Sequence, residues 1–342
     1  MKNAIRIMQI AFTYIGTVVG AGFATGQEIL QFFTQYGKWA TLTILLSTIL
    51  FIWLGTKMMI ISRRIHARSY EDLNTYLFGQ QSGRHISTIM LFILIGVNSI
   101  MLAGAGSVFV QHLNLHYQTG LIITLVGSYF LLNKGIHSIL YMNSIVVPMM
   151  LSISLLIISR TWQMPNADHF LTLTTDANLS MAWISPILYT AFNLVMAQAV
   201  LVPLGSHTES ITAIKWGGII GGLGVGFMLM AAHFAMSAQM PGITQFEIPM
   251  GSIAFQLGIV VQLIYVLLIF LEIFTTFVAD VYGITLQIQQ RFKVSPRLIS
   301  IAIMLACFLF SQLGFSYLLS VLYPLFGFLS LFWIVKLMLI KK

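Results

Sequence analysis

The sequence has little charge and a single cysteine. Asp, Glu, Lys and Arg together make up 8% of the 342 residues, whereas 58% are hydrophobic and the mean hydropathy is +0.91. So few charged side chains cannot cover a water-soluble globule of this length, and the composition predicts a polytopic membrane protein. Because Cys307 is the only cysteine, an intrachain disulfide, a thiolate metal cluster and a Cys-x-x-Cys redox pair are excluded.

Enzyme motifs are absent as well. The sequence contains no phosphate-binding loop with its lysine and no Ser-His-Asp hydrolase motif, so we expect no enzyme activity and no cofactor beyond a coupling ion. The formal net charge of +8 does not indicate nucleic-acid binding, because the basic residues lie in short segments between apolar runs. The expected partner is therefore the lipid bilayer and not a nucleic acid.

The positions of the basic residues predict the membrane topology. Ten apolar spans can be placed near 5–36, 39–62, 85–111, 118–133, 137–159, 181–204, 211–239, 254–286, 297–312 and 315–340. If the N-terminus is cytoplasmic, the outer connections hold only Lys38 and Arg160 of the 17 Lys and Arg residues. We therefore predict a multi-pass protein of the bacterial inner membrane with both termini cytoplasmic. A cleaved signal peptide is disfavoured, because its removal would spoil this charge balance.

The external connection from Thr161 to Ser180 divides the chain into two sets of five spans, residues 1–165 and 175–342. Five crossings are an odd number, so the second half is inverted relative to the first. Inverted repeats are a transporter architecture in which discontinuous helices form a solute site at the membrane midplane. The predicted fold class is therefore all-α, with ten transmembrane helices arranged as two inverted five-helix repeats in one membrane domain.

The first span contains four glycines within eleven residues, at positions 16, 20, 22 and 26. Each costs about 1 kcal/mol relative to alanine in a helix interior, so the run predicts an unwound backbone between an inner half near 5–18 and an outer half near 22–36. Close helix packing through G-x-x-x-G pairs is the alternative. The sixth span, with Pro186, Asn193 and Gln198, is expected to be broken too, although no glycine lies near Asn193.

Ionisable side chains inside a span point to function, because each costs about 2.5–3.5 kcal/mol at mid-bilayer on insertion scales. Glu272 lies near the middle of the eighth span, and helical spacing puts Thr275 and Thr276 on its face. Hydroxyl and carbonyl oxygens suit an alkali cation, unless each threonine bonds back to its own helix. For Glu28 the sequence leaves two interpretations: a proton carrier or gate, or a residue that only faces the outer vestibule. We expect Asp280 near the cytoplasmic end, solvated or in a salt bridge.

Two further groups of polar residues allow more than one interpretation. The pairs Asn98 and Ser99, and Asn143 and Ser144, are typical of hydrogen bonds between helices, with ligand binding as the alternative. The cytoplasmic stretch 70–78 has the pattern of a short amphipathic helix on the membrane surface, with an ordinary polar loop as the alternative.

The run FTYIGTVVGAGFATGQEI at positions 12–29 closely resembles the opening of the YkvI-like bacterial membrane proteins. That family lies within the amino acid–polyamine–organocation superfamily, whose members share the leucine-transporter fold with broken helices 1 and 6. The resemblance implies a sodium site made of the carbonyls of Gly16 and Val19, the carbonyl of Glu272, and the hydroxyls of Thr275 and Thr276. Thr17 and Phe23 replace the asparagine found in sodium-coupled relatives, which argues against a second sodium site.

The sequence thus predicts a cation-coupled secondary transporter of a small organic solute, an amino acid or a related amine, that works by alternating access. The outer half-helix would point its N-terminal end at a solute carboxylate. We expect the solute site to be lined by Thr17, Gly20, Ala21, Gly22, Asn98, Phe192 and Asn193. Glu28 and Glu272 are the candidates for proton coupling. The alternative is a nutrient sensor that keeps the fold without transport, and a metal-ion transporter is disfavoured because the methionines are scattered.

Overall fold

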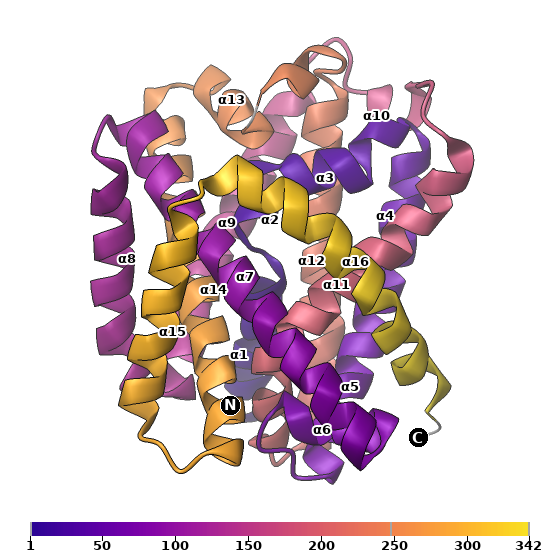
Figure 1. Ribbon diagram of the computed structural model, residues 1–342. Helices are drawn as coiled ribbons and strands as arrows, with labels where there is room; N and C mark the ends of the chain where they lie inside the picture. The colour runs from indigo at the N-terminus through magenta and orange to yellow at the C-terminus, as the bar shows by residue number, and fades with distance from the viewer. Residues whose placement is uncertain (1, 247, 341–342) are drawn as a thin grey trace.

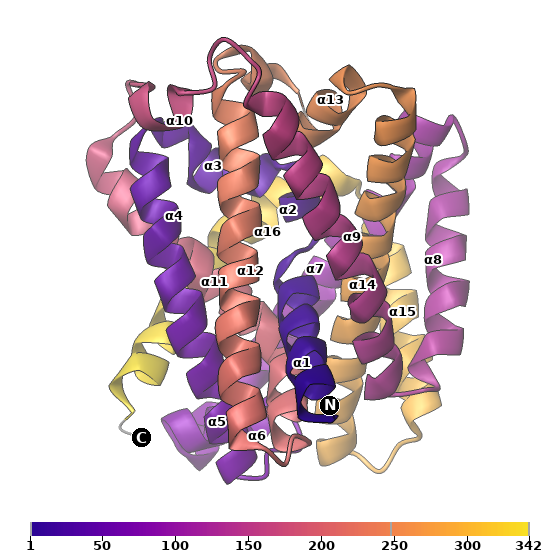
Figure 2. The same ribbon diagram turned by 180° about the vertical axis from the view of Figure 1, so that it is seen from behind.

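A computed structural model describes residues 2–246 and 248–340, and within these ranges all regular secondary structure is helical. Figures 1 and 2 show that α1 begins and α16 ends at the same end of the molecule, near α6; we call this the terminal end. α10 and α13 lie at the opposite end, which we call the far end. A chain that starts and finishes on one side crosses an even number of times, in agreement with ten spans.

Each expected span falls on helix. The first span consists of α1 (Lys2–Val18), α2 (Ala21–Thr25), α3 (Gln27–Phe32) and the 3₁₀ turn η1 (Thr34–Tyr36). The second consists of α4 (Trp39–Leu50), the π-helical turn η2 (Phe51–Gly55) and α5 (Thr56–Arg64). The others are α7 (Gln80–Leu113), α8 (Tyr117–Leu132), α9 (Ile136–Thr161), α11 (Leu179–Ser206), α12 (Ile211–Ser237), α14 (Ile259–Arg291), α15 (Pro296–Ser311) and α16 (Phe315–Leu339).

The connections carry short helices as well: α6 (Tyr70–Phe78), α10 (His169–Thr172), η3 (Gly242–Gln245) and α13 (Pro249–Gln256). Among the described residues, six helices are long and apolar enough to cross a membrane. They are Trp39–Arg64, Gln80–Val110, Ile136–Thr161, Leu179–Ser206, Ile211–Ser237 and Ile259–Arg291. The chain is thus a multi-pass membrane protein, while the ten crossings and the inversion of the halves stay predictions.

The predicted break in the first span is confirmed. α1 ends at Val18, and Gly20 is extended, with φ −114° and ψ −166°, before α2 begins at Ala21. A second interruption follows at Gly26, whose φ of +87° is a left-handed conformation that favours glycine. The glycine run therefore does more than pack helices: it leaves the backbone of α1 open at its C-terminal end.

The expected break in the sixth span is wrong. α11 is one continuous helix of 28 residues that accommodates both Pro186 and Pro203. No glycine lies near its centre, and the Asn193 amide donates to the Tyr189 carbonyl at 3.0 Å, one turn back, which adds a hydrogen bond along the helix. Buried neighbours on all sides of its central residues allow a proline-containing helix to stay continuous at membrane depth.

A glycine face on α12 holds α1 in position. A Cβ atom built on Gly221 would lie 2.7 Å from Cδ1 of Tyr14, and one built on Gly217 would lie 2.6 Å from Cγ2 of Ile10. The Tyr14 hydroxyl also donates to the Phe51 carbonyl at 2.7 Å, which ties α1 to the π-helical turn. Small residues thus let the backbones approach closely, as expected where lipid supplies no hydrophobic drive between helices.

The charge bias predicts which end faces the cytoplasm, and Asp168 offers a test. It is exposed and directly precedes α10 at the far end, whereas Arg64 is exposed as the last residue of α5, whose label lies near α6 at the terminal end in Figure 1, and Cys307 is buried. We expect Asp168→Cys to react with a membrane-impermeant thiol reagent in intact cells and Arg64→Cys to react only after the membrane is permeabilised. Labelling of Arg64→Cys but not of Asp168→Cys in intact cells would reverse the assignment.

Candidate functional site

The break in α1 faces α14 through three oxygen atoms. The hydroxyl of Thr276 lies 3.4 Å from the carbonyl oxygen of Gly16 and 3.3 Å from that of Val19. These carbonyls are available because a helix that stops at Val18 leaves its last carbonyls without an intrahelical donor. A hydroxyl has one hydrogen and cannot satisfy both carbonyls at once. The structure therefore brings together three of the five oxygens expected to hold a cation.

The other two residues of the expected set are Thr275, directly before Thr276 on α14, and Glu272, one turn before it. The Thr275 hydroxyl donates to the Glu272 carbonyl at 3.1 Å, so the bond back to its own helix is present. The side chain of Glu272 is fully buried, and neither of its carboxyl oxygens has a hydrogen-bond partner within the described ranges. A buried carboxylate without a partner costs several kcal/mol, so this group calls for a cation or a proton.

A small cavity adjoins the three oxygens. It is lined by Thr17, Val18, Gly20, Glu28, Val97, Met101, Phe192, Asn193, Met196, Thr276 and Asp280, and we call it the central cavity. Its volume is about 20 Å³, which is room for about one water molecule. Four residues expected at the solute site line it, namely Thr17, Gly20, Phe192 and Asn193. The protein is therefore closed around this cavity, and side chains must move to admit a solute.

The other expected solute-site residues lie around the cavity rather than on its wall. Gly22 is covered by the carboxyl group of Glu28, since a Cβ atom at Gly22 would overlap Glu28 Oε1. Asn98 on α7 is fully buried, and both polar atoms of its amide lack a hydrogen-bond partner among the described residues. Ala21 begins α2, and its side chain lies outside the described part.

Two polar residues have a different place from the one expected. Asp280 is 2% exposed rather than solvated, it lines the central cavity, and its Oδ2 has no hydrogen-bond partner in the part of the chain that the structure describes. Asn143 on α9 packs against the break, because a Cβ atom on Gly16 would lie 2.5 Å from its Oδ1. Glu272, Thr276 and Asp280 recur at every fourth residue, so they share one face of the helix. This spacing could have predicted that Asp280 faces the same site as Thr276.

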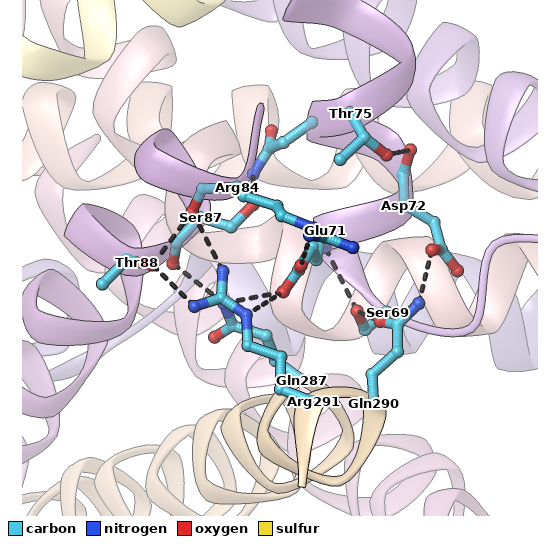
Figure 3. Close-up of polar contacts among 11 residues, drawn as sticks. Ser69, Glu71, Asp72, Thr75, Arg84, Ser87, Thr88, Gln287, Gln290 and Arg291 are labelled. Carbon is cyan, nitrogen blue, oxygen red and sulfur yellow. Dashed lines mark hydrogen bonds and ion pairs between the residues drawn. The ribbon is translucent and has the colours of Figure 1, made fainter. Parts of the chain in front are cut away.

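The terminal end is closed by a polar network around α6. This stretch is a helix, one of the two forms that its sequence allowed, and it packs against other helices with Tyr70, Leu73 and Asn74 fully buried. Figure 3 shows Glu71 of α6 and Arg291 of α14 at the centre of the network. Arg291 Nε donates to Glu71 Oε2 at 2.6 Å, and Arg84 Nε lies 3.8 Å from Glu71 Oε1.

Further bonds in the network join α6 to α14 and α16. Gln290 contacts both Ser69 and Asp72, and Trp333 of α16 donates to the Asn74 amide oxygen at 2.8 Å. Burial raises the pKa of Tyr70 well above its ordinary value, so its hydroxyl keeps its proton and donates to Gln287 Oε1. These contacts fix the C-terminal end of α14, which follows Asp280 in the chain. We call the network the α6 latch; its members are Ser69, Tyr70, Glu71, Asp72, Asn74, Gln287, Gln290, Arg291 and Trp333.

We expect Arg291→Ala to loosen the α6 latch. Loss of a hydrogen bond to a charged group costs about 1.5–3 kcal/mol, so hydrogen exchange of the α6 amides should quicken roughly 10- to 150-fold. Mass spectrometry of α6 peptides measures this. Arg84→Ala is the matched control, because that side chain is 63% exposed and its ion pair is longer. Equal exchange in both variants would show that the Glu71–Arg291 pair does not hold α6.

The far end is closed by contacts over α2. The Tyr265 hydroxyl of α14 donates to the Ala24 carbonyl at 2.7 Å, and the Gln27 amide donates to the Phe246 carbonyl at 3.0 Å. A Cβ atom on Gly26 would lie 2.7 Å from Cγ of Met250 in α13. The connection between α12 and α14, which carries α13, therefore packs directly on the turn between α2 and α3. The central cavity is thus covered from both ends of the molecule.

Comparison with known proteins shows the family. The chain is 40% identical over 330 residues to the uncharacterized membrane protein YkvI of Bacillus subtilis (strain 168), an alignment that covers 94% of this chain and 92% of YkvI. The chain belongs to the YkvI family. It is also 28% identical over 326 residues to the uncharacterized protein YyaD of the same organism, with 95% and 94% of the two chains covered. No protein-family model matches the chain.

Solved structures show the fold of this YkvI-family protein. MhsT in complex with L-phenylalanine superposes with a TM-score of 0.70 at 15% identity, covering 94% of this chain and 87% of MhsT. A Na⁺-coupled sialic acid symporter gives 0.71 at 14% identity, covering 97% and 79%. The Eremococcus coleocola manganese transporter gives 0.61 at 12% identity, covering 98% and 78%. These proteins have the leucine-transporter fold, so the chain shares it, and none of them is an enzyme.

Proposed function

We propose that this protein is a cation-coupled secondary transporter of a small organic solute, an amino acid or a related amine. The observation that carries the proposal is the junction of the α1 break with α14, where the carbonyls of Gly16 and Val19 face the Thr276 hydroxyl. Irregular backbone at membrane depth is tolerated where it lines a site, and half-helix carbonyl ends coordinate coupling ions in transporters of this architecture.

Sodium is the coupling ion that these oxygens fit best. Carbonyl and hydroxyl oxygens are hard ligands, and the described residues hold no group of three or more His, Cys, Asp or Glu side chains that would suit a transition metal. Gly16, Val19 and Thr276 would be ligands together with the Glu272 carbonyl and Thr275, whose hydroxyl would turn away from its own helix. The main variant is coupling to protons through Glu272 or Glu28.

The predicted cation site and the central cavity share part of their walls, and this shared wall can couple cation binding to solute binding. Thr276 both faces the break and lines the central cavity, and Gly20 lies in the same cavity at the end of the break. A cation that draws the α1 carbonyls and Thr276 together stabilises the α1–α14 junction, and with it the wall that a solute contacts. Each ligand would then favour the conformation that the other binds, which is the reciprocity that coupled transport requires.

Alternating access needs a closure on each side of the solute. The α6 latch at the terminal end and the α2–α13 contacts at the far end are the two closures that the fold offers. In this proposal the terminal end is cytoplasmic and the two inverted five-helix halves rock around the central cavity. A nutrient sensor with the same fold would bind its ligand without opening both closures.

Ligand-dependent thermal stability of the purified protein tests whether a cation binds. We expect the melting temperature to rise when sodium chloride replaces choline chloride at constant ionic strength. A ligand of the native state at 100 times its Kd stabilises by about 2.7 kcal/mol. A panel of amino acids and amines, each tested with and without sodium, then reveals the solute as an additional shift. A melting temperature that changes with neither sodium, pH nor any solute would contradict the proposal.

A further inference from the structure

The central cavity is acidic. Two carboxyl groups line it, those of Glu28 and Asp280, and among the described residues on its wall there is no lysine, arginine or histidine. Its remaining walls are chiefly apolar, with Val18, Val97 and Phe192 on three different helices. A solute in this space therefore meets two carboxyl groups, apolar side chains and the polar groups of Thr17, Asn193 and Thr276, with no basic side chain to receive an anionic group.

Asp280 supplies the second carboxyl group of the cavity, and it is buried. It is 2% exposed, and its Oδ2 has no hydrogen-bond partner in residues 2–246 and 248–340. An ionisable group inside a spanning helix is costly, and such groups persist where they bind a substrate or an ion. Asp280 follows Thr276 by four residues on α14, so it faces the central cavity one helical turn from the predicted sodium ligands.

Two glycines bring Glu28 to the same cavity. Gly26, with its φ of +87°, turns the chain between α2 and α3, so that Glu28 on α3 folds back toward the break. Gly22 leaves the room that the carboxyl group occupies, since a Cβ atom there would overlap Glu28 Oε1. The side chain is 4% exposed. The backbone of the first span is thus shaped to hold a carboxylate over the cavity.

We propose that the solute is an organic cation, a primary amine without a carboxylate group, whose ammonium binds at Glu28 and Asp280. The inference rests on the transporter function proposed above and names its substrate class. The three hydrogens of an ammonium group can donate to both carboxylates. The aromatic face of Phe192 attracts cations, and the apolar wall accepts the hydrocarbon body of the amine.

An amino acid fits this cavity less well than the amine that lacks its carboxylate. The solute carboxylate would be buried beside two like charges, which is unfavourable at short range. Gly20, which precedes α2, lines the cavity, but α2 has only five residues, too few for a strong anion site at its N-terminus. A divalent metal ion also fits poorly, because hard divalent cations take six or more oxygen ligands and most of this wall is hydrocarbon.

Matched pairs of probes separate these classes. Binding to purified protein in sodium chloride is measured by isothermal titration calorimetry for phenethylamine against phenylalanine, isopentylamine against leucine, and 1,4-diaminobutane against ornithine. Manganese chloride is titrated separately. We expect at least one amine to bind at least about tenfold more tightly than its amino acid. Asp280→Asn should weaken that amine roughly 10- to 150-fold, the range for one hydrogen bond between charged groups.

Two further variants assign the effect to the cavity. Glu28→Gln should weaken the same amine by a similar factor, whereas Asp168→Asn, an exposed acid at the far end, should leave its affinity unchanged. Sodium-dependent thermal stabilisation of Asp280→Asn shows that this variant is folded. Tighter binding of an amino acid than of its amine, or of manganese alone, would overturn the inference while leaving a transporter. Binding of no probe, together with no stabilisation by sodium or by pH, would overturn the proposed function as well.

Discussion

Gly22→Leu is expected to abolish solute binding while the protein still inserts and stays monodisperse in detergent. Any side chain at this position occupies the space of the Glu28 carboxyl group, so Glu28 must leave the wall of the central cavity. An added branched side chain also fills the room that the break keeps open for the backbone to approach a ligand. Binding is measured by calorimetry with the solute found in the stability screen, and folding by size-exclusion chromatography.

Two other glycine variants make this result specific. Gly327→Leu on α16 is the matched control, because a Cβ atom there has no heavy atom within 4 Å, and it should bind the solute as the wild type does. Gly20→Leu should also abolish binding, since a Cβ atom at Gly20 already lies 3.2 Å from Cε of Met101 across the cavity. Full binding by both Gly20→Leu and Gly22→Leu would mean that the glycine run serves helix packing alone.

Thr276→Ala is expected to raise the sodium concentration needed for half-maximal stabilisation. The variant removes the hydroxyl oxygen that faces the carbonyls of both Gly16 and Val19. Leaving a buried polar group unpaired costs about 1–3 kcal/mol, which corresponds to roughly 5- to 150-fold in apparent sodium affinity. The measurement is a sodium titration of the melting temperature, with choline chloride keeping the ionic strength constant.

Thr285→Ala is the control for Thr276→Ala on the same helix. Thr285 is also buried, but its hydroxyl donates to its own Val281 carbonyl at 2.7 Å, so its loss should not change the sodium dependence. Thr276→Ser should keep the wild-type sodium dependence, because serine retains the hydroxyl oxygen. If wild type and Thr276→Ala respond to sodium equally, the cation does not bind at the break. A wild type that ignores sodium but takes up solute in a pH-dependent way, flattened by Glu272→Gln or Glu28→Gln, would instead indicate coupling to protons.

Local features of the chain were predictable from the sequence. The break between Val18 and Ala21 follows from the low helix propensity of the glycines around it, which is a local property of the sequence. The amphipathic pattern of 70–78, also a local feature, allowed the helix that the structure has, but it allowed a polar loop as well. The burial of this helix under the α6 latch was not predictable, because the partners Arg291 and Trp333 lie more than 200 residues further along the chain.

Features that depend on tertiary packing were predicted less well. The prolines of α11 suggested a broken helix, but the neighbours that cover it keep it continuous. Asp280 was expected near a helix end because hydropathy ends the eighth span near residue 286, whereas α14 continues to Arg291 and leaves Asp280 deeper and buried. The sequence therefore predicted most of the residues around the central cavity, among them Glu28, Phe192 and Asn193, and only the structure added the second carboxyl group, that of Asp280.

Solute uptake into proteoliposomes under an imposed ion gradient tests cation-coupled transport most directly. The radiolabelled solute from the stability screen is offered to vesicles that carry an inward sodium gradient, an inward proton gradient or neither. We predict that one of the two gradients drives accumulation above the external concentration, and that an ionophore for that ion abolishes the accumulation. Binding without uptake, or uptake that only equilibrates and is the same with and without either gradient, would contradict cation-coupled transport.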